Sequence, residues 1–398
     1  MAKILAKYYI ESKLPLEKAA AAICVEEGVG TWTKLKTLKP EIERRYGADI
    51  VELDRMAHTA TIAYSFEEYS HDIGGIPQLL SFVAGNLFGL SELQNVRLLD
   101  IEPPKELVKM FRGPKFGIEG VRRLTGIKDR PIIGTIIKPK IGLSPREQAE
   151  VFYRAAIGGA DFGKDDENLV NQRFCPLAER TRRIADVIDR VKDETGRRVY
   201  YTINVTTRPD KILEAANLAL KNGATSLMVD VTCAGYAAVQ ALAEEPSVKV
   251  PIHVHRAGHA AFTRNPKHGI AMLVVAKLVR LAGGDQMHTG TVVGKMEGDP
   301  KEVVPVNEFL RSEWFGLKTT FPVASGGLHP GLVPKLVKLL GNDIIMNYGG
   351  GIHGHPHGTE AGARAVKQAV DATMQGVGLR EYAKTHPELK IALEKWSA

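Results

Sequence analysis

Eight short runs of β-branched, aromatic and other apolar residues recur between residues 131 and 351, and stretches with helical periodicity separate them. Strands that alternate with helices pair in parallel, because each helix carries the chain back across the sheet. Eight such units over about 270 residues agree in number and size with a closed (β/α)8 barrel. A doubly wound open sheet is the alternative, but eight strands without interruption favour closure. The runs are PIIGTIIK, ADFGKDDE, VYYTINVTT, SLMVDV, PIHVHRA, DQMHTG, TTFPVASGG and IIMNYGGG.

The N-terminal part of the chain has a different pattern, with two strand-like and two helix-like segments that do not repeat regularly. This pattern predicts a small α+β domain of ferredoxin-like type. Proline and glycine residues then punctuate residues 103–114, so we expect the domain boundary there. The predicted domains are residues 1–112 and 113–398. The segments are AKILAKYYIE and HTATIAYSFEEY for the strands and LPLEKAAAAICVEEG and IPQLLSFVAGNLFGL for the helices.

Composition excludes several classes of protein. The three cysteines, Cys24, Cys175 and Cys233, form no metal-spaced cluster, and their odd number argues against a disulfide framework. A reducing cytoplasm is the expected location. No apolar run is long enough to span a membrane, because Lys277 and Arg280 interrupt the most apolar stretch, GIAMLVVAKLVRLAGG.

The net charge of +7 and the pI of about 9.1 indicate anionic partners, either nucleic acid or small anionic molecules. The densest basic stretch is RTRRIADVIDRVKDETGRR, but apolar residues recur through it at helical spacing. We therefore interpret it as the solvated face of a helix, and the positive charge suits phosphorylated metabolites as well as RNA. The apolar positions are Leu177, Ile184, Val187, Ile188 and Val191.

Polar residues gather where the predicted strands end. In a barrel the carboxyl ends of all strands open onto one mouth, where active sites form. The pattern depends on no single motif, and it predicts an active site built from most of the strands. The residues are Lys138, Lys140, Lys164, Asp166, Glu167, His253, His255, Arg256, His288, Ser325, Gly326, Gly327, Gly349, Gly350 and Gly351.

The stretch GKDDE at the second strand is the most unusual of these ends. Lys164 and Asp166 lie two residues apart, so on a strand their side chains face the same way. Oxygen ligands from Asp166 and Glu167 suit a hard cation such as Mg²⁺. Lys164 has several possible uses: a salt-bridge partner, a Schiff-base nucleophile, or, after CO2 adds to the neutral amine, a carbamate ligand. A buried structural ion-pair network is the alternative to a metal site.

Glycines at the last two strand ends indicate backbone N–H groups that bind a phosphate, because barrels often bind phosphate after strands 7 and 8. The segment HTGTVVGKMEG carries Lys295 among glycines and is typical of a mobile loop that closes over a ligand. His253 and His255 share one face of their strand, and one of them can be a hydrogen-bonded core residue instead. Zinc is the rival use of this pair, but no third ligand has suitable spacing. We interpret HGHPHG at residues 353–358 as a loop.

Several motifs together resemble the large subunit of ribulose-1,5-bisphosphate carboxylase/oxygenase (RuBisCO), in its archaeal-type form III branch. They cover nearly the whole chain, in the family's order. The motifs are GVGTWTKL, VAGNLFGL, GTIIKPKIGL, GADFGKDDEN, HVHRAGHAAFTRNPKHG, MHTGTVVGKMEG, PVASGGLHPG and NYGGGIHGHPHG.

The resemblance implies a use for Lys164, which would be carbamylated by an activating CO2 and would hold Mg²⁺ with Asp166 and Glu167. It also implies that this carbamate takes the C3 proton of ribulose-1,5-bisphosphate. Lys138 would protonate the product at C2, and Lys295 would polarise the incoming CO2. The remaining matched positions are His255 as a base near the C3 hydroxyl, Lys140 beside the metal site, Arg256, His288, Ser325 and Gly326 around the sugar and one phosphate, and Gly327, Gly349 and Gly350 as phosphate donors.

The resemblance further implies assembly. Glu26, Thr31, Trp32 and Asn86 match residues that the family's small domain lends to a neighbouring subunit's barrel. We therefore expect a homo-oligomer built from dimers, without a small subunit, that acts on ribulose bisphosphate with CO2 or O2 and binds neither nucleic acid nor membrane. A RuBisCO-like enolase, isomerase or decarboxylase is the nearest alternative, and a non-enzymatic RNA-binding or scaffold protein is the alternative from another class.

Overall fold

The computed structural model describes residues 2–294 and 299–396, so the predicted loop lysine, Lys295, lies outside the described residues. The chain forms two compact units. The first consists of Met1–Arg112, Gly258–Ala282 and Trp314–Leu317, and the second of Gly113–Ala257, Gly283–Glu313 and Lys318–Ala398. Each domain predicted from the sequence is one continuous segment, whereas each of these units combines segments from different parts of the chain.

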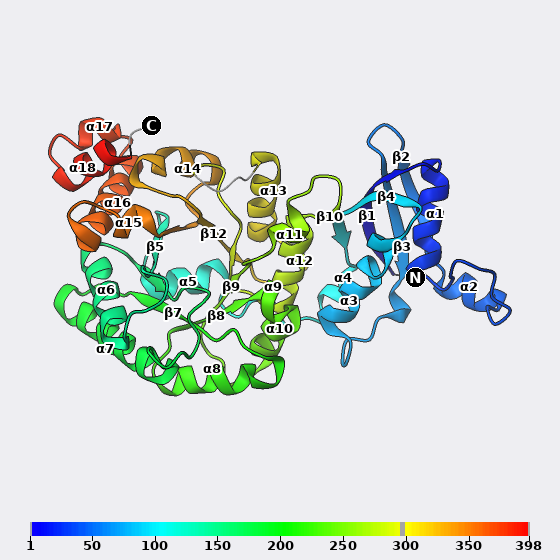
Figure 1. Ribbon diagram of the computed structural model, residues 1–398, viewed down its shortest axis with the longest axis horizontal. Coiled ribbons are helices and arrows are strands. Elements are labelled where there is room, and N and C mark those ends of the chain that lie inside the picture. The colour runs from blue at the N-terminus through cyan, green and yellow to red at the C-terminus, as the bar shows by residue number, and fades with distance from the viewer. Residues whose placement is uncertain (1, 295–298, 397–398) are drawn as a thin grey trace. The chain divides into compact units, whose positions relative to one another are not determined.

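The second unit contains a closed parallel barrel, with eight strands among the described residues (Figure 1). The ring closes where β13 pairs with β5, with Asn347 opposite Gly134. The barrel prediction is confirmed, with one strand in each of the eight predicted runs, and the open sheet is excluded. The strands are β5 (Ile132–Ile136), β6 (Phe162–Lys164), β7 (Tyr200–Asn204), β8 (Ser226–Asp230), β9 (Ile252–His255), β11 (Gln286–His288), β12 (Phe321–Ser325) and β13 (Ile345–Tyr348).

Helices surround these strands, as α6, α7 and α8 show in Figure 1. Helix α6 begins at a capping box, in which the side chains of Ser144 and Glu147 accept hydrogen bonds from each other's backbone N–H groups. The helices of this unit are α5 (Gly117–Thr125), α6 (Pro145–Gly158), α7 (Leu177–Thr195), α8 (Ile212–Lys221), α9 (Val231–Ala234), α10 (Tyr236–Glu244), α13 (Pro300–Arg311), α14 (Val333–Leu340), α15 (Gly350–His353), α16 (Gly358–Met374), α17 (Leu379–Tyr382) and α18 (Pro387–Lys395), with 3₁₀ turns η3 (Pro209–Lys211) and η4 (Pro330–Leu332).

Helix α7 is the predicted basic helix. Its apolar stripe is buried, and Arg183 and Arg190 are exposed and lie near acids one turn away. The Arg190 guanidinium lies 2.8 Å from Glu194, the kind of i,i+4 pair that neutralises a solvated helix face. This arrangement supports the interpretation of a solvated face over that of a nucleic-acid surface.

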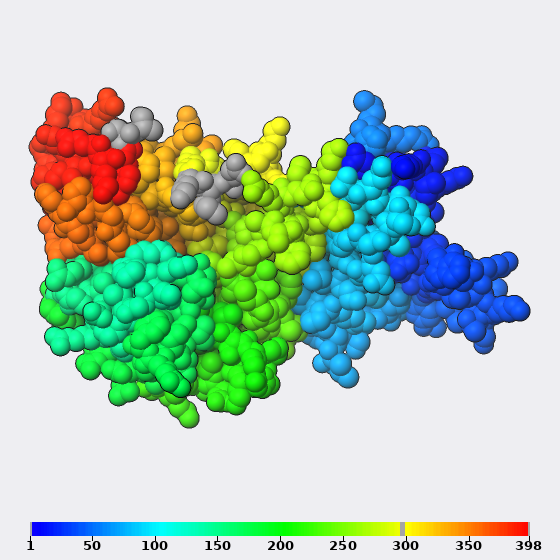
Figure 2. Space-filling model, viewed as in Figure 1, coloured from blue at the N-terminus to red at the C-terminus, as the bar shows by residue number. Residues whose placement is uncertain are grey.

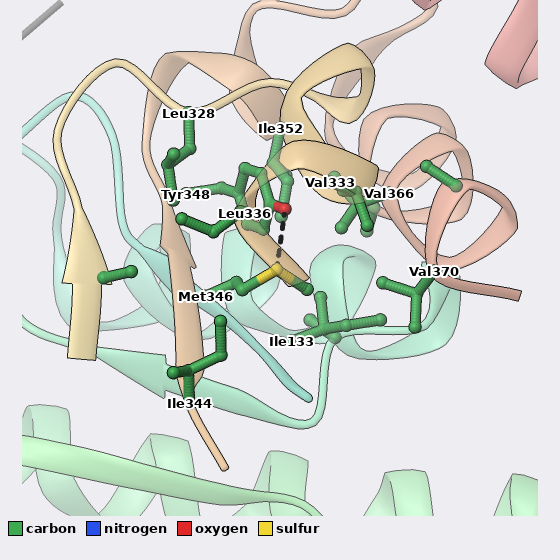
Figure 3. Close-up of a cluster of buried hydrophobic side chains, with 14 of the residues drawn as sticks. Ile133, Leu328, Val333, Leu336, Ile344, Met346, Tyr348, Ile352, Val366 and Val370 are labelled. Carbon is green, nitrogen blue, oxygen red and sulfur yellow. Dashed lines mark hydrogen bonds between the residues drawn. The ribbon is translucent and has the colours of Figure 1, made fainter. Parts of the chain in front are cut away.

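A cluster of buried apolar side chains joins strands to helices on one side of the barrel (Figure 3). Ile133 and Met346 of the strands pack there against Leu336 of α14 and Val366 of α16. The hydroxyl group of Tyr348 donates a hydrogen bond to Met346 Sδ at 3.6 Å, so the one polar group in this view has a partner. Helix α18 packs on α16, and Figure 2 shows these C-terminal helices (red) against the orange segment.

The first unit contains a mixed sheet of five strands among the described residues, in the order β10-β4-β1-β3-β2. The α+β prediction is confirmed. In β1, Ile4, Ala6, Tyr8 and Ile10 are buried and alternate with partly exposed residues, which is the period of a strand covered on one face. The elements are β1 (Lys3–Ser12), β2 (Asp49–Asp54), β3 (Thr59–Ser65), β4 (Leu93–Glu102), β10 (Gly269–Ile270), α1 (Leu16–Glu26), α2 (Pro40–Tyr46), α3 (Gly75–Ala84), α4 (Lys105–Val108), α11 (Ala260–Thr263), α12 (Met272–Ala282), η1 (Phe66–Glu68) and η2 (Leu87–Gly89).

Helix α12 explains why part of the later chain groups with this unit. Its Lys277 is 8% exposed and donates to the carbonyl of Ile101, at the end of β4, at 2.8 Å. The same Nζ lies 2.5 Å from Asp100. Arg280, the other polar residue that interrupts the apolar stretch at residues 269–284, is also buried and donates to the Leu317 carbonyl at 3.1 Å. Over the described residues, no helix has the length and apolarity that a membrane crossing needs.

Candidate active site

The carboxyl ends of β5 and β6 bring together two lysines and two acids. Nζ of Lys138, just after β5, donates to Asp166 Oδ2 at 2.8 Å. Lys164, the last residue of β6, is fully buried and donates to the backbone carbonyl of Asp165 at 2.7 Å. Gly163 beside it has no space for a side chain, because a Cβ there would lie 2.5 Å from the ring of Phe152. The strand is thus held close to α6.

The burial of Lys164 changes its acid–base chemistry. Burial lowers the pKa of its ammonium group from 10.5 to about 8, although the neighbouring carboxylates of Glu167 and Asp166 act in the opposite direction. A substantial part of the amine is therefore neutral near pH 8, and only a neutral amine has a lone pair for bond formation.

Glu167 has an unused oxygen. Its Oε2 is buried and has no hydrogen-bond donor among the described residues. The backbone of Glu167 is held in place, because Asn204 Nδ2 donates to its carbonyl oxygen at 3.0 Å. A buried carboxylate oxygen without a donor costs free energy unless a cation or a proton satisfies it. The site therefore fits a hard cation, with Asp166 beside it.

Within residues 2–294 and 299–396, no group of three or more His, Cys, Asp or Glu side chains is arranged to hold a metal ion. Asp166 and Glu167 supply two carboxylates, so a third protein ligand would have to come from another kind of side chain. A carbamate on Lys164 would be an oxygen ligand of this kind.

Asp165, between these residues, faces the helices instead of the barrel interior. Its carboxylate accepts hydrogen bonds from Arg180 of α7 at 3.1 Å, from the Tyr201 hydroxyl at 2.8 Å and from the Asn204 backbone at 2.9 Å. Both Asp165 and Arg180 are completely buried. The alternative of a structural ion pair thus describes Asp165, and the sequence interpretation assigned no separate use to it.

The histidine that faces the acids is oriented by a residue that the sequence interpretation missed. His255 Nδ1 lies 2.9 Å from Oδ2 of Asp230, the last residue of β8, and its Nε2 lies 3.8 Å from Glu167 Oε2. Burial raises the pKa of Asp230, but hydrogen bonds from His255 and from the Ala257 backbone outweigh burial and lower it overall. A charged Asp230 fixes the proton of His255 on Nδ1 and leaves Nε2 as the basic nitrogen. The signal was an acid at the end of the run SLMVDV.

The other two histidines are buried in the barrel interior. His253 and His288 share a contact of 2.8 Å between their Nε2 atoms, and His288 Nδ1 lies 2.7 Å from Ser325 Oγ. His253 is thus the core residue of the pair at positions 253 and 255, as one interpretation of the sequence allowed.

The glycine-rich ends lie at β12 and β13. Gly326 and Gly327 have φ angles of +118° and +69°, and a Cβ on Gly294 would lie 2.7 Å from the Gly326 carbonyl oxygen. The first part of the predicted loop therefore approaches this turn closely. Gly349 follows β13, and a Cβ there would lie 3.5 Å from Cε of Lys138. Gly350, the next residue, has open space at its Cβ position.

Two further predicted positions, Arg256 and Lys140, lie near strand ends of the barrel unit, and His353 of the predicted loop lies close to β5. Burial lowers the pKa of Arg256, just after β9, to about 10. Lys140, two residues beyond Lys138, is exposed. His353 of the HGHPHG segment contacts the Ile136 carbonyl oxygen at 3.0 Å through Nε2, so it packs behind β5.

The four predicted positions of the first unit lie at the end of α1 and in two loops. Glu26 ends α1, Thr31 and Trp32 follow in the next loop, and Asn86 precedes η2. Trp32 is 90% exposed. Its indole is therefore accessible to another molecule.

The comparisons identify the family. The ribulose bisphosphate carboxylase large chain family matches in two parts, its N-terminal domain at residues 1–107 and its catalytic domain at residues 117–396. The ribulose bisphosphate carboxylase of Pyrococcus abyssi is 45% identical over 398 residues, which cover 99% of this chain and 93% of that protein. The chain belongs to the ribulose bisphosphate carboxylase large chain family. The recognition of this family from the motifs, and with it an enzyme of the carboxylase type, is confirmed.

Solved structures agree with this assignment. The octameric RuBisCO of Pyrococcus horikoshii OT3 is 44% identical with a TM-score of 0.94, over 99% of this chain and 93% of that one. The dimeric archaeal RuBisCO of Hyperthermus butylicus is 41% identical with a TM-score of 0.90, over 99% and 96%. A RuBisCO-like protein from Burkholderia fungorum is also similar, at 29% identity and a TM-score of 0.88 over 99% and 100%.

Proposed function

We propose that the chain is a ribulose-1,5-bisphosphate carboxylase/oxygenase that depends on Mg²⁺ and on a carbamate at Lys164. The carboxylation joins ribulose-1,5-bisphosphate, CO2 and water into two molecules of 3-phosphoglycerate, and O2 competes with CO2. The observation that carries the proposal is the buried Lys164, with its lowered pKa, beside Asp166 and a Glu167 oxygen without a donor.

Activation is the first step that this geometry supports. The neutral amine of Lys164 attacks the carbon of CO2, an N–C bond forms, and one proton leaves for solvent. The product is an anionic oxygen ligand, which Asp166 and Glu167 complement. Mg²⁺ held by these oxygens would polarise the sugar's C2 carbonyl and stabilise the negative charge that develops there.

The protein's own groups then supply proton transfers. Lys164, once carbamylated, accepts the proton from C3, and His255 is a second base whose Nε2 faces the acids. Lys138 Nζ, which lies 2.8 Å from Asp166 Oδ2, would donate a proton to C2 of the product. Lys295 would polarise the incoming CO2, and Lys140 would support the metal site.

Substrate binding uses the rest of the mouth. Arg256 and His288 lie at the ends of β9 and β11. Ser325 at the end of β12 would contact the sugar, and Gly326 beside it would lie near one phosphate. The phosphates would lie on backbone N–H groups of Gly327, Gly349 and Gly350.

We propose further that the active unit is a homodimer in the cytoplasm without a small subunit. Glu26, Thr31, Trp32 and Asn86 would complete the barrel site of a neighbouring copy. The exposed Trp32 and the oligomeric states of the two archaeal relatives support this part of the proposal.

The test is ¹⁴CO2 fixation into acid-stable product from ribulose bisphosphate, with and without preincubation in CO2 and Mg²⁺. We expect fixation after preincubation, none in Lys164→Ala, and full activity in the exposed control Lys335→Ala. The likeness to a RuBisCO-like protein gives the alternative function, an enolase, isomerase or decarboxylase. Enolisation of another phosphorylated sugar without any fixation by the wild-type protein would favour that alternative.

A further inference from the structure

A chain of hydrogen bonds crosses the barrel interior from β7 to the mouth. The Tyr200 hydroxyl lies 3.1 Å from Gln286 Nε2, and Gln286 Oε1 lies 2.7 Å from His253 Nδ1. His253 Nε2 lies 2.8 Å from His288 Nε2, and His288 Nδ1 lies 2.7 Å from Ser325 Oγ. Every member except Ser325 is buried, and polar side chains replace the aliphatic layer that usually fills such a barrel.

The direction of this chain follows from the orientation of the Gln286 amide, whose Nε2 donates to the Tyr200 hydroxyl and whose Oε1 faces His253. Gln286 Oε1 only accepts, so His253 must carry a hydrogen on Nδ1. Of the two facing Nε2 atoms, one must donate and the other must accept. A neutral His253 with its hydrogen on Nδ1 accepts at Nε2, so His288 donates from Nε2. The Nδ1 atom of His288 is then an acceptor, and the Ser325 hydroxyl donates to it.

The buried surroundings agree with two neutral rings. Burial lowers the pKa values of His253 and His288 far below the ordinary value of 6.5, and the nearby Lys164 and His255 act in the same direction. A neutral imidazole has one donor and one acceptor nitrogen, as the chain requires.

We infer that Gln286 and His253 are positioning residues that make Ser325 a hydrogen-bond acceptor toward the substrate. The single hydrogen of Ser325 is directed inward, so only lone pairs of its Oγ face the mouth. Such an oxygen pairs with a hydroxyl group of the sugar and repels a phosphate or carboxylate oxygen. The identity of the ligand as a sugar bisphosphate rests on the proposed function, but the direction of the chain does not.

The opposite direction has a definite structural requirement. If the Gln286 amide were turned over, its NH₂ group would face His253, and each proton in the chain would move to the other nitrogen. His253 would then carry its hydrogen on Nε2 and His288 on Nδ1, and Ser325 would donate outward. The two directions therefore differ in the tautomers of two histidines.

The direct test is ¹⁵N NMR of the full-length protein labelled at the histidine ring nitrogens, with His253→Gln and His288→Asn used to assign the signals. We expect His253 protonated at Nδ1 only and His288 at Nε2 only. The reverse pair of tautomers, or a charged ring at either position, overturns the inference. The measurement uses the protein without substrate, so its result does not depend on catalytic activity.

A second test compares two variants of the Gln286 side chain. Gln286→Glu keeps an oxygen acceptor toward His253, whereas Gln286→Leu removes it. Loss of one ordinary hydrogen bond is worth roughly 1 kcal/mol, which corresponds to about a fivefold change. We expect Gln286→Leu to raise the KM for ribulose bisphosphate about fivefold or more and to disturb the His288 tautomer, and Gln286→Glu to keep both near wild type. Equal effects of the two variants on the KM and on the tautomer would overturn the positioning role. Wild-type tautomers as expected in a protein that does not use ribulose bisphosphate would refute only the proposed function.

Discussion

Lys164 should bind CO2 with a pH dependence set by its burial. With a pKa of about 8, about half of the amine is neutral at pH 8. At the ordinary value of 10.5 only roughly one amine in 300 would be neutral at that pH. Burial therefore makes about 150 times more of the nucleophilic form available. Since the neutral fraction rises with pH, uptake should increase about tenfold per pH unit below 8 and level off above it.

The assay is the initial rate of ¹³CO2 uptake at a constant concentration of dissolved CO2 from pH 6.5 to 10, with the carbamate trapped chemically and located by mass spectrometry. The label should lie on Lys164, and Lys164→Arg should take up none there. A rate that still rises tenfold per unit between pH 9 and 10 would show that the amine keeps its ordinary pKa, and the argument from burial would be refuted.

Three further outcomes test other contacts. Asp230→Asn should lower kcat about 100-fold or more by releasing the His255 tautomer, with the overall fold unchanged by circular dichroism; near-normal kcat would contradict that role. Arg180→Met should cost roughly 3–5 kcal/mol in unfolding free energy, because its carboxylate partner is left buried and unpaired, and urea titration measures this. Mixed Glu26→Gln and Lys164→Ala chains should regain activity after reassortment, since some sites are then built from two intact halves. A fully active monomer in ultracentrifugation would exclude shared sites.

The barrel was predictable because strands covered on both faces are mostly apolar over their whole length, as PIIGTIIK and SLMVDV are. Other elements gave no such signal. Strand β10 has two residues, Gly269–Ile270, and is a strand only through its pairing with β4. Likewise, β2 is mostly exposed and reads DIVELD, which lacks a clear apolar alternation. The grouping of Gly258–Ala282 with the N-terminal unit depends on contacts between segments far apart in the chain.

In the candidate site, too, some residues could be proposed from the sequence and others could not. Strand ends are visible in a sequence, so the lysines and acids at 138, 164, 166 and 167 could be proposed from position alone. Asp230, Arg180 and Gln286 act through partners on other strands or helices, and only the folded chain brings those partners together. The sequence also left several uses open for Lys164, because its pKa depends on a burial that spacing does not reveal.

The central claim is that the barrel mouth enolises ribulose bisphosphate through Lys164. Exchange of the C3 proton with solvent, measured with activated protein in tritiated water, tests this step before any carboxylation. The account predicts exchange in the wild type and none in Lys164→Ala. It also predicts retained exchange, but loss of CO2 fixation by several orders of magnitude, in Lys295→Ala. Exchange at the wild-type rate in Lys164→Ala, under conditions in which the substrate binds, would contradict the account.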